Sequence, residues 1–145
     1  MIVIDTSGVL AAKDAAHPQH RAVAEAILGT SHPLLLSPFV VAECDYMLAT
    51  RLGVDAAREF IDEIARDAFQ LVEVDSGDVA AAGGIIDRYG DLNIGITDAS
   101  LVIVAARYQT TRLLTFDERH FRTVAPLWGA PAFTLLPADR PDGRS

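Results

Sequence analysis

The chain contains the stretch Met1-Ile2-Val3-Ile4-Asp5-Thr6-Ser7, and the interpretation of its fold starts from these residues. Positions 2–4 form a short, wholly apolar run of β-branched side chains, which is typical of a strand buried on both faces of a sheet. A carboxylate follows this run directly, at Asp5. The stretch therefore predicts a buried strand that ends at an acidic residue.

Apolar strands and helical segments alternate along the rest of the chain. We predict strands at 2–4, 34–36, 69–74, 112–115 and 132–136. The predicted helices cover 9–13, 18–28, 39–52, 55–68, 76–89 and 98–108, with a helical turn at 117–121, and the helix-start signals include Ser37-Pro38, Ser76 and Thr97. Strands that alternate with helices imply an α/β fold, in which a parallel sheet is covered by helices on both faces.

Composition narrows the class of protein. The chain has 145 residues, half of them hydrophobic, which suits a single domain with its own core and argues against intrinsic disorder. We predict one domain over residues 1–136. Residues 137–145 read PADRPDGRS, and we predict a loose tail there because the segment has prolines and charges but no large apolar side chain.

The sequence gives no sign of secretion or of membrane insertion. The longest unbroken apolar run covers only residues 101–106, whereas a membrane-spanning helix needs roughly 20. No basic region precedes the first apolar stretch, as it would in a signal peptide. The single cysteine, Cys44, cannot form an internal disulfide or a zinc–thiolate cluster. We therefore expect a cytoplasmic protein in a reducing compartment.

Acidic residues outnumber basic ones by 20 to 12, so the formal net charge is −8. This balance argues against a protein that coats nucleic acid non-specifically, because such binding needs a basic surface. It does not exclude a nucleic-acid enzyme whose acids gather in a metal site. Most of the acids have ordinary explanations; those between residues 55 and 67, for example, alternate with arginines like a solvated helix face.

Four acids interrupt or border apolar segments instead. Asp5 and Asp117 each follow a predicted strand, Glu43 lies among apolar residues of a predicted helix, and Asp98 stands at a predicted helix start. Each has an alternative explanation, since Asp5 and Asp117 could cap helices, Asp98 could be stabilised by a helix dipole and Glu43 could lie on an exposed face.

Together these acids indicate a metal site. Ligands of open parallel sheets bind at the carboxyl ends of the strands, which is where we expect the four acids to converge. Carboxylates that converge repel one another and raise each other's pKa, and a hard divalent cation removes that conflict. Because we expect no histidine or cysteine ligand nearby, the pattern favours Mg²⁺, with Mn²⁺ as a substitute, over Zn²⁺.

The chain resembles the PIN-domain ribonucleases, specifically the VapC-type toxins of toxin–antitoxin pairs. No single motif carries the resemblance, but an ordered set of four does, and it spans residues 1 to about 136. The matching stretches are Ile2-Val3-Ile4-Asp5-Thr6-Ser7, Ser37-Pro38 with Val41-Ala42-Glu43, Ile96-Thr97-Asp98-Ala99-Ser100-Leu101, and Leu114-Thr115-Phe116-Asp117-Glu118-Arg119-His120-Phe121.

The resemblance implies a three-layer α/β/α sandwich around a mainly parallel sheet of four to five strands. It implies that Asp5 and Asp98 bind a metal ion directly, while Glu43 and Asp117 bind a second ion or hold water molecules on the metal. The implied activity is magnesium-dependent endoribonuclease cleavage of RNA. The implied partners are a cognate antitoxin and a second copy of the chain, with Val9, Leu10, Val40, Tyr46, Met47 and Leu48 as apolar residues available for contact.

Other residues near the motifs have two interpretations each. Thr6 and Thr97 could orient phosphate or ligand carboxylates, or cap helices. His120 stands where the family often carries an acid; it could contact substrate phosphate, but we favour a surface histidine. The arginines nearest the motifs in sequence could hold RNA phosphates or be ordinary surface charges: Arg112, Arg119 and Arg122.

The main alternative is a catalytically silent PIN-like module that only binds other proteins. Retention of all four acids weighs against it. A haloacid-dehalogenase-type phosphatase would need a second aspartate at position 7, where this chain has Ser7. A receiver domain would need a lysine late in the chain, whereas Lys13 is the only lysine.

Overall fold

The computed structural model describes residues 1–139 and contains a five-stranded sheet in the order β3-β2-β1-β4-β5, with every neighbouring pair parallel. The strands are β1 (Val3–Ile4), β2 (Leu34–Leu36), β3 (Phe69–Leu71), β4 (Arg112–Leu114) and β5 (Thr134–Leu136). The helices are α1 (Thr6–Lys13), α2 (His20–Leu28), α3 (Pro38–Arg51), α4 (Val54–Ala65), α5 (Ser76–Arg88), α6 (Ile96–Arg107) and α7 (Glu118–Phe121), with a short 3₁₀ turn, η1 (Gly90–Leu92). The predicted α/β class and parallel sheet are confirmed.

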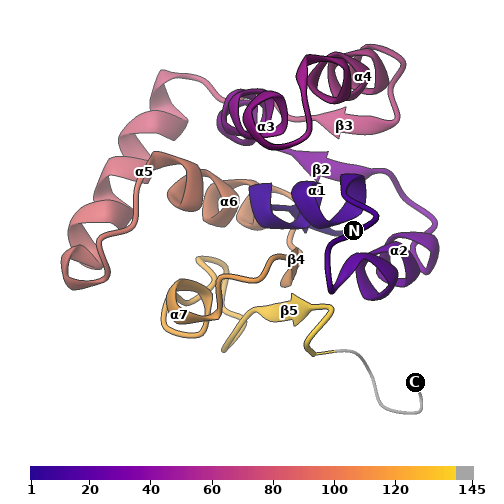
Figure 1. The fold of residues 1–145 in the computed structure, drawn as a ribbon. Helices are drawn as coiled ribbons and strands as arrows, with labels where there is room; N and C mark the ends of the chain where they lie inside the picture. The colour runs from indigo at the N-terminus through magenta and orange to yellow at the C-terminus, as the bar shows by residue number, and fades with distance from the viewer. Residues whose placement is uncertain (140–145) are drawn as a thin grey trace.

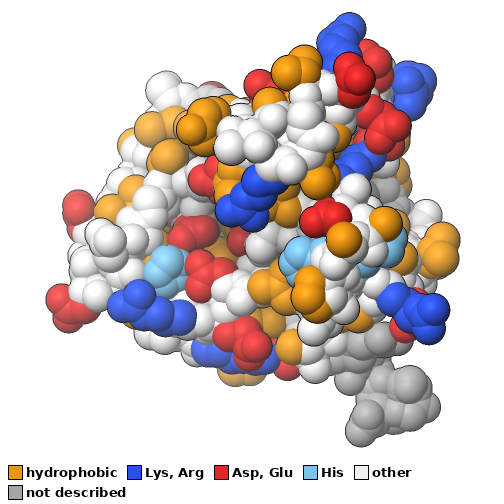
Figure 2. Space-filling view, in the orientation of Figure 1, with side chains coloured by type: hydrophobic (Ala, Val, Ile, Leu, Met, Phe, Trp, Pro, Cys, Tyr) orange, Lys and Arg blue, Asp and Glu red, His pale blue; other side chains and the backbone are white. Residues whose placement is uncertain are grey.

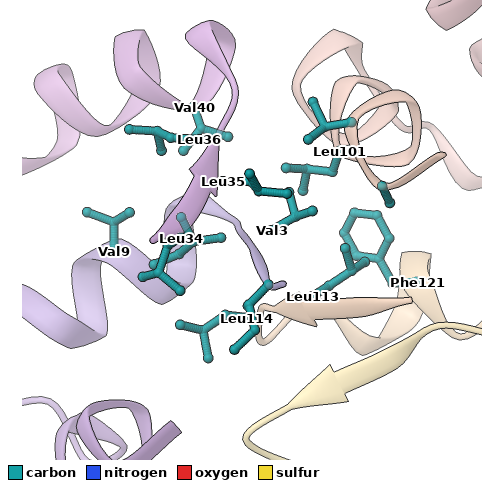
Figure 3. Packing of buried hydrophobic residues seen from close by; sticks show 14 of the residues in the cluster. Val3, Val9, Leu34, Leu35, Leu36, Val40, Leu101, Leu113, Leu114 and Phe121 are labelled. Atoms are coloured by element: carbon teal, nitrogen blue, oxygen red, sulfur yellow. The ribbon is translucent and has the colours of Figure 1, made fainter. Parts of the chain in front are cut away.

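The sheet is buried on both faces, as the apolar strand sequences indicate. Leu34, Leu35 and Leu36 are all buried although successive side chains of a strand point to opposite faces. Figure 3 shows Leu34 and Leu36 on the side of Val9, while Leu35 lies toward Leu101. Helices on both faces therefore complete one core, which contains the three central strands.

The strand order creates a switch point between β1 and β4. From β1 the chain passes through α1 and α2 to β2 on one side, whereas β4 leads through α7 to β5 on the other side. Right-handed crossovers then put α1–α4 on one face of the sheet and α5–α7 on the other, and Figure 1 shows α5, α6 and α7 gathered away from α2 and α4. Ligands of open α/β sheets bind at such a point, beyond the carboxyl ends of the strands.

Several helix starts differ from the prediction, and for α1 and α5 a carboxylate cap is the cause. Helix α1 begins at Thr6 rather than position 9 because the Asp5 carboxylate accepts the Thr6 N–H. Helix α5 is capped by Asp75, which forms a capping box with Asp78, and not by Ser76. Helix α6 begins at Ile96 after Gly95, so that Thr97 lies inside its first turn.

The remaining boundaries move by a few residues. Helix α2 begins at His20 instead of position 18, α4 ends at Ala65 instead of position 68, and β3 ends at Leu71 instead of position 74. Residues 140–145 of the predicted tail lie outside the described residues. Asp139 accepts hydrogen bonds from the Leu135 N–H (2.8 Å) and from Arg122, so the chain remains attached to β5 beyond position 136.

The core accounts for four of the six residues that we named for an interface between two copies of the chain. Val9, Leu10, Val40 and Leu48 are buried inside a single chain. Tyr46, in contrast, is 73% exposed. Within the described residues, no helix is long and apolar enough to cross a membrane.

We predict opposite effects for two glycine-to-alanine substitutions. A Cβ atom at Gly8 of α1 would lie 2.6 Å from the backbone carbonyl oxygen of Leu114, so Gly8→Ala must push α1 away from β4. We expect it to lower the free energy of unfolding by about 2 kcal/mol. Gly84, in α5, has nothing within 4 Å of such an atom, and Gly84→Ala is expected to raise the free energy of unfolding by about 1 kcal/mol.

Urea unfolding of the two variants and the wild type measures both effects. A Gly8→Ala protein as stable as the wild type would show that α1 does not pack on β4 as described.

Candidate metal centre and active site

The structure brings all four predicted site residues into one cleft of about 360 Å³ at the switch point. Asp5 ends β1, Asp117 follows β4, Glu43 projects from α3, and Asp98 lies in the first turn of α6. On the face shown in Figure 2, acidic side chains lie in a hollow beside a histidine, with basic side chains on both sides. The sequence therefore placed these acids correctly, whereas their chemical roles stay a prediction.

Asp5 is buried and hydrogen-bonded at both carboxylate oxygens. Its Oδ1 accepts the backbone N–H of Thr6 at 2.7 Å, and its Oδ2 accepts the hydroxyl of Thr115 at 2.7 Å. The helix-cap interpretation is thus correct for Asp5, and it coexists with a place in the cleft. Burial, with the nearby charges of Asp98 and Glu43, outweighs these hydrogen bonds and raises the pKa of Asp5 to about 6.

Thr115 connects the ends of β1 and β4. The parallel register pairs Ile4 with Leu114, so the next residues, Asp5 and Thr115, lie opposite each other. Besides donating to Asp5, the Thr115 hydroxyl accepts the backbone N–H of Asp117 at 3.0 Å. It therefore positions two of the four acids, and sequence reasoning assigned it no such role.

Asp98 and Asp117 share one histidine. His120 Nδ1 lies 2.8 Å from Asp98 Oδ2 and 2.8 Å from Asp117 Oδ2. Asp117 also caps α7 through its Oδ1, which accepts the His120 backbone N–H at 3.1 Å. The preference for a surface histidine was wrong, because the His120 side chain is only 16% exposed and lies between two of the acids.

Burial is the main reason why the pKa of Asp98 lies above its usual range. The Asp117 carboxylate raises this pKa further, while the hydrogen bond from His120 opposes both effects. The expectation of a cluster without histidine is therefore corrected. Cys44 is buried near Asp5 and Glu43, and burial raises the pKa of its thiol to about 12.

A serine pair holds the two helices that carry Glu43 and Asp98. Ser37 Oγ caps α3 by accepting the Phe39 N–H, and it lies 2.7 Å from Ser100 Oγ in α6. The Ser100 hydroxyl donates to the Thr97 carbonyl oxygen at 2.6 Å. Neither Thr6 nor Thr97 caps a helix, which corrects that interpretation of both residues.

Arg51 lines the cleft, and sequence reasoning missed it. Glu43, Met47 and Arg51 follow one another at intervals of four residues, so they form one stripe along α3, and all three border the cleft. This spacing was the available signal.

The arginines that we selected by sequence proximity lie elsewhere. Arg112 begins β4 and is therefore at the opposite edge of the sheet, Arg122 binds Glu118 and Asp139, and Arg119 is exposed outside the cleft lining.

The donor set of the cleft fits a divalent cation. Ligand atoms of Asp98, Asp117 and His120 all lie within 4.8 Å of one another, and Asp5 and Glu43 border the same cleft. The raised pKa values of Asp5 and Asp98 show that burial and like charge disfavour the ionised carboxylates, a cost that a bound cation offsets. Carboxylate oxygens with one imidazole nitrogen are ordinary ligands of such ions.

The raised pKa of Asp5 predicts that the free energy of unfolding of the metal-free protein depends on pH. Its pKa of about 6 exceeds the ordinary 3.8, so ionising Asp5 is harder in the folded chain than in the unfolded chain. The contribution of Asp5 to stability therefore falls as pH rises from about 4 to about 6, and then stays constant, for a total of about 3 kcal/mol. We expect Asp5→Asn to gain stability relative to the wild type over this range, measured by urea unfolding in a chelating buffer.

Asp87→Asn, at an exposed position of α5, serves as the control and is expected to follow the wild type at every pH. At pH 7.5, added Mg²⁺ is expected to raise the melting temperature of the wild type and not that of Asp5→Asn. A difference between wild type and Asp5→Asn that does not change with pH would contradict the assignment.

Comparison with known proteins agrees with this geometry. A family model described as PIN domain matches residues 2–126. Ribonuclease VapC26 of Mycobacterium tuberculosis is 44% identical over 136 residues, covering 94% of this chain and 100% of the relative. The crystal structure of VapC20 of Mycobacterium tuberculosis, described as a sarcin–ricin loop cleaving toxin, superposes with a TM-score of 0.75 at 20% identity, over 81% of this chain and 90% of that one. The α/β/α PIN fold is thereby confirmed, and the chain belongs to the PIN-domain family, within its VapC-type ribonucleases.

Proposed function

We propose that this protein is a magnesium-dependent endoribonuclease that acts in the cytoplasm as the toxin of a toxin–antitoxin pair. The observation that carries the proposal is the convergence of Asp5, Glu43, Asp98 and Asp117 in one open cleft at the switch point of the sheet. The relative VapC26 is named a ribonuclease, and VapC20 is described as a sarcin–ricin loop cleaving toxin; both descriptions support cleavage of RNA here.

Each acid has a role that its surroundings suit. Asp5 and Asp98 are the direct ligands of Mg²⁺, or of Mn²⁺ as a substitute, since burial raises the pKa of both carboxyl groups and the charge of Asp98 contributes to the raised pKa of Asp5. Glu43 and Asp117, at the more open rim, hold a second ion or orient water. A divalent ion in this cleft would supply a water of lowered pKa and stabilise the charge that develops on the phosphate. The network of Thr115, Ser37 and Ser100 keeps the carboxylates in place.

Arg51 gives the cleft a contact for RNA. It is exposed, lines the cleft and makes no hydrogen bond or ion pair within residues 1–139. A guanidinium on the rim of an acidic cleft can bind an RNA phosphate whose neighbour approaches the carboxylates. With a chain charge of −8, such local contacts make RNA binding selective instead of general.

We also propose a homodimer and a cognate antitoxin as partners. Four of the six residues that we named for a dimer interface are buried in the core of the single chain. We therefore place the apolar contact between the two copies at the end of α3 and the start of α4, where Tyr46, Leu52 and Val54 are 73%, 39% and 74% exposed. An antitoxin segment with a basic side chain would be attracted to the acidic cleft. The alternative, a silent protein-binding module, would have no need of a buried Asp5 whose ionisation opposes folding.

The nuclease proposal predicts that Asp98→Asn lowers the cleavage rate by at least about a hundredfold. The amide keeps the shape of the side chain but removes the charge that faces the ion. We expect the wild type to cut a panel of structured RNAs with Mg²⁺ and to stop when EDTA is added, as followed on denaturing gels.

Asp87→Asn is the matched control and is expected to cut like the wild type. In bacteria that lack the partner, expression of the wild type is expected to arrest growth and Asp98→Asn to permit it. Metal-independent cleavage, or equal cleavage by wild type and Asp98→Asn, would exclude the proposed chemistry.

The role of Arg51 predicts a change in salt dependence. Fluorescence anisotropy measures the binding of a single-stranded RNA to the Asp98→Asn variant at several salt concentrations. We expect log Kd to rise linearly with the logarithm of the salt concentration. Arg51→Gln is expected to reduce this slope by about 0.7, the contribution of one phosphate contact on a single strand. Arg51→Lys is expected to restore most of the slope.

Arg66→Gln is the matched control, because Arg66 is also exposed but ends α4 near the start of β3, at the opposite edge of the sheet. Equal slopes for Arg51→Gln and Arg66→Gln would rule out a phosphate contact at Arg51.

A further inference from the structure

His120 differs from the other residues of the site because it brings nitrogen into a group of oxygen ligands. Its Nδ1 atom lies 2.8 Å from one oxygen of Asp98 and 2.8 Å from one oxygen of Asp117. Ionised carboxylates only accept hydrogen bonds, so Nδ1 carries the hydrogen, which it donates to Asp98 while Asp117 lies beside it. In the metal-free protein, this hydrogen occupies the position that three converging ligands leave for an ion.

The two nitrogen–oxygen spacings match two edges of one face of an octahedron. Around an ion with bonds of about 2.1 Å, neighbouring ligand atoms of an octahedron lie about 3 Å apart. The two nitrogen–oxygen distances are 2.8 Å, and the ligand atoms of all three residues lie within 4.8 Å of one another. Small movements, together with transfer of the Nδ1 hydrogen to Nε2 through solvent, would convert the hydrogen-bonded group into a set of ligands with a neutral imidazole.

Local structure holds His120 in this orientation. Asp117 receives the His120 backbone N–H with one oxygen and faces the imidazole with the other, so α7 fixes both residues together. Phe121, the next residue, is buried against Phe133 with ring centroids 6.2 Å apart, which anchors the helix to the core.

The charge of the group also suits a single divalent ion. Two carboxylates and a neutral imidazole carry a charge of −2, which one divalent cation balances. An acid at position 120 would add a further negative charge to an already crowded cleft. The exchange of an acid for histidine also changes the preferred metal, since imidazole favours first-row transition ions while a purely oxygen site suits Mg²⁺.

We infer that His120 is a nitrogen ligand in a mixed Asp98–Asp117–His120 site, which selects a first-row transition ion such as Mn²⁺ over Mg²⁺ more strongly than carboxylates alone would. This inference deepens the proposed function, because it concerns the metal of the same cleft. It concerns binding, however, so it can be tested without any RNA.

The test uses Mn²⁺ as a paramagnetic probe of the full chain. Electron spin-echo modulation of bound Mn²⁺ is expected to show coupling to an imidazole ¹⁴N nucleus in the wild type. His120→Asn removes the imidazole while its amide oxygen replaces Nδ1 without a change of charge, and the coupling is expected to disappear. Titrations of Mn²⁺ and Mg²⁺ followed by calorimetry are expected to show that the preference for Mn²⁺ falls by about tenfold in this variant.

His32→Asn is the matched control, because His32 is exposed and lines a different cavity, between α2 and α4; it is expected to keep both the coupling and the preference. Circular dichroism verifies that each variant is folded. Absence of ¹⁴N coupling in the wild type, or an unchanged metal preference in His120→Asn, would overturn the inference. If the coupling is present but no RNA is cut with either ion, the inference stands and the nuclease proposal fails. If RNA is cut but the wild type shows no coupling, the nuclease proposal stands and the inference fails.

Discussion

The hydrogen bond from the Thr115 hydroxyl to Asp5 Oδ2 joins the carboxyl ends of β1 and β4, and the geometry of the cleft depends on it. The two strands are parallel neighbours, so their carboxyl ends lie side by side at the switch point of the sheet. Thr115 also accepts the N–H of Asp117, which leads into α7 and brings His120 toward Asp98. One hydroxyl group thus connects the buried acid of the first strand with the acid and the histidine of the fourth.

This arrangement places negative charge where the fold least favours it. Asp5 is buried, and its pKa rises to about 6 even though two hydrogen bonds favour the ionised form. Asp98 shows the same direction for the same first cause. A protein under selection for stability alone would replace such residues. Their presence together in one cleft has a physical explanation if a cation offsets the repulsion, which links the cost in stability to the proposed chemistry.

His120 shows how a single substitution alters such a site without changing the fold. The residue caps nothing and fills no core cavity, but it contacts two acids at equal distances. As a neutral imidazole it adds no negative charge to the cleft, and it offers a nitrogen atom beside the carboxylate oxygens. Arg51 has a complementary place on the rim, where a cation without a partner among residues 1–139 faces the acidic interior. Acidic floor and basic rim together suit a substrate that is itself a chain of phosphates.

The sequence by itself determined the α/β class, the parallel sheet and the four acids, because apolar runs, helix periods and strand-end positions are local patterns. Ile2-Val3-Ile4-Asp5 alone contains a buried strand and the residue at its end. Only the tertiary structure decided the partners of those acids. Thr115 lies 110 residues from Asp5, Ser100 lies 63 from Ser37, and His120 lies 22 from Asp98. Their contacts arise from strand register and helix packing, which no local pattern encodes, so a histidine assigned to the surface lies in the site and an arginine beyond the motifs lines the cleft.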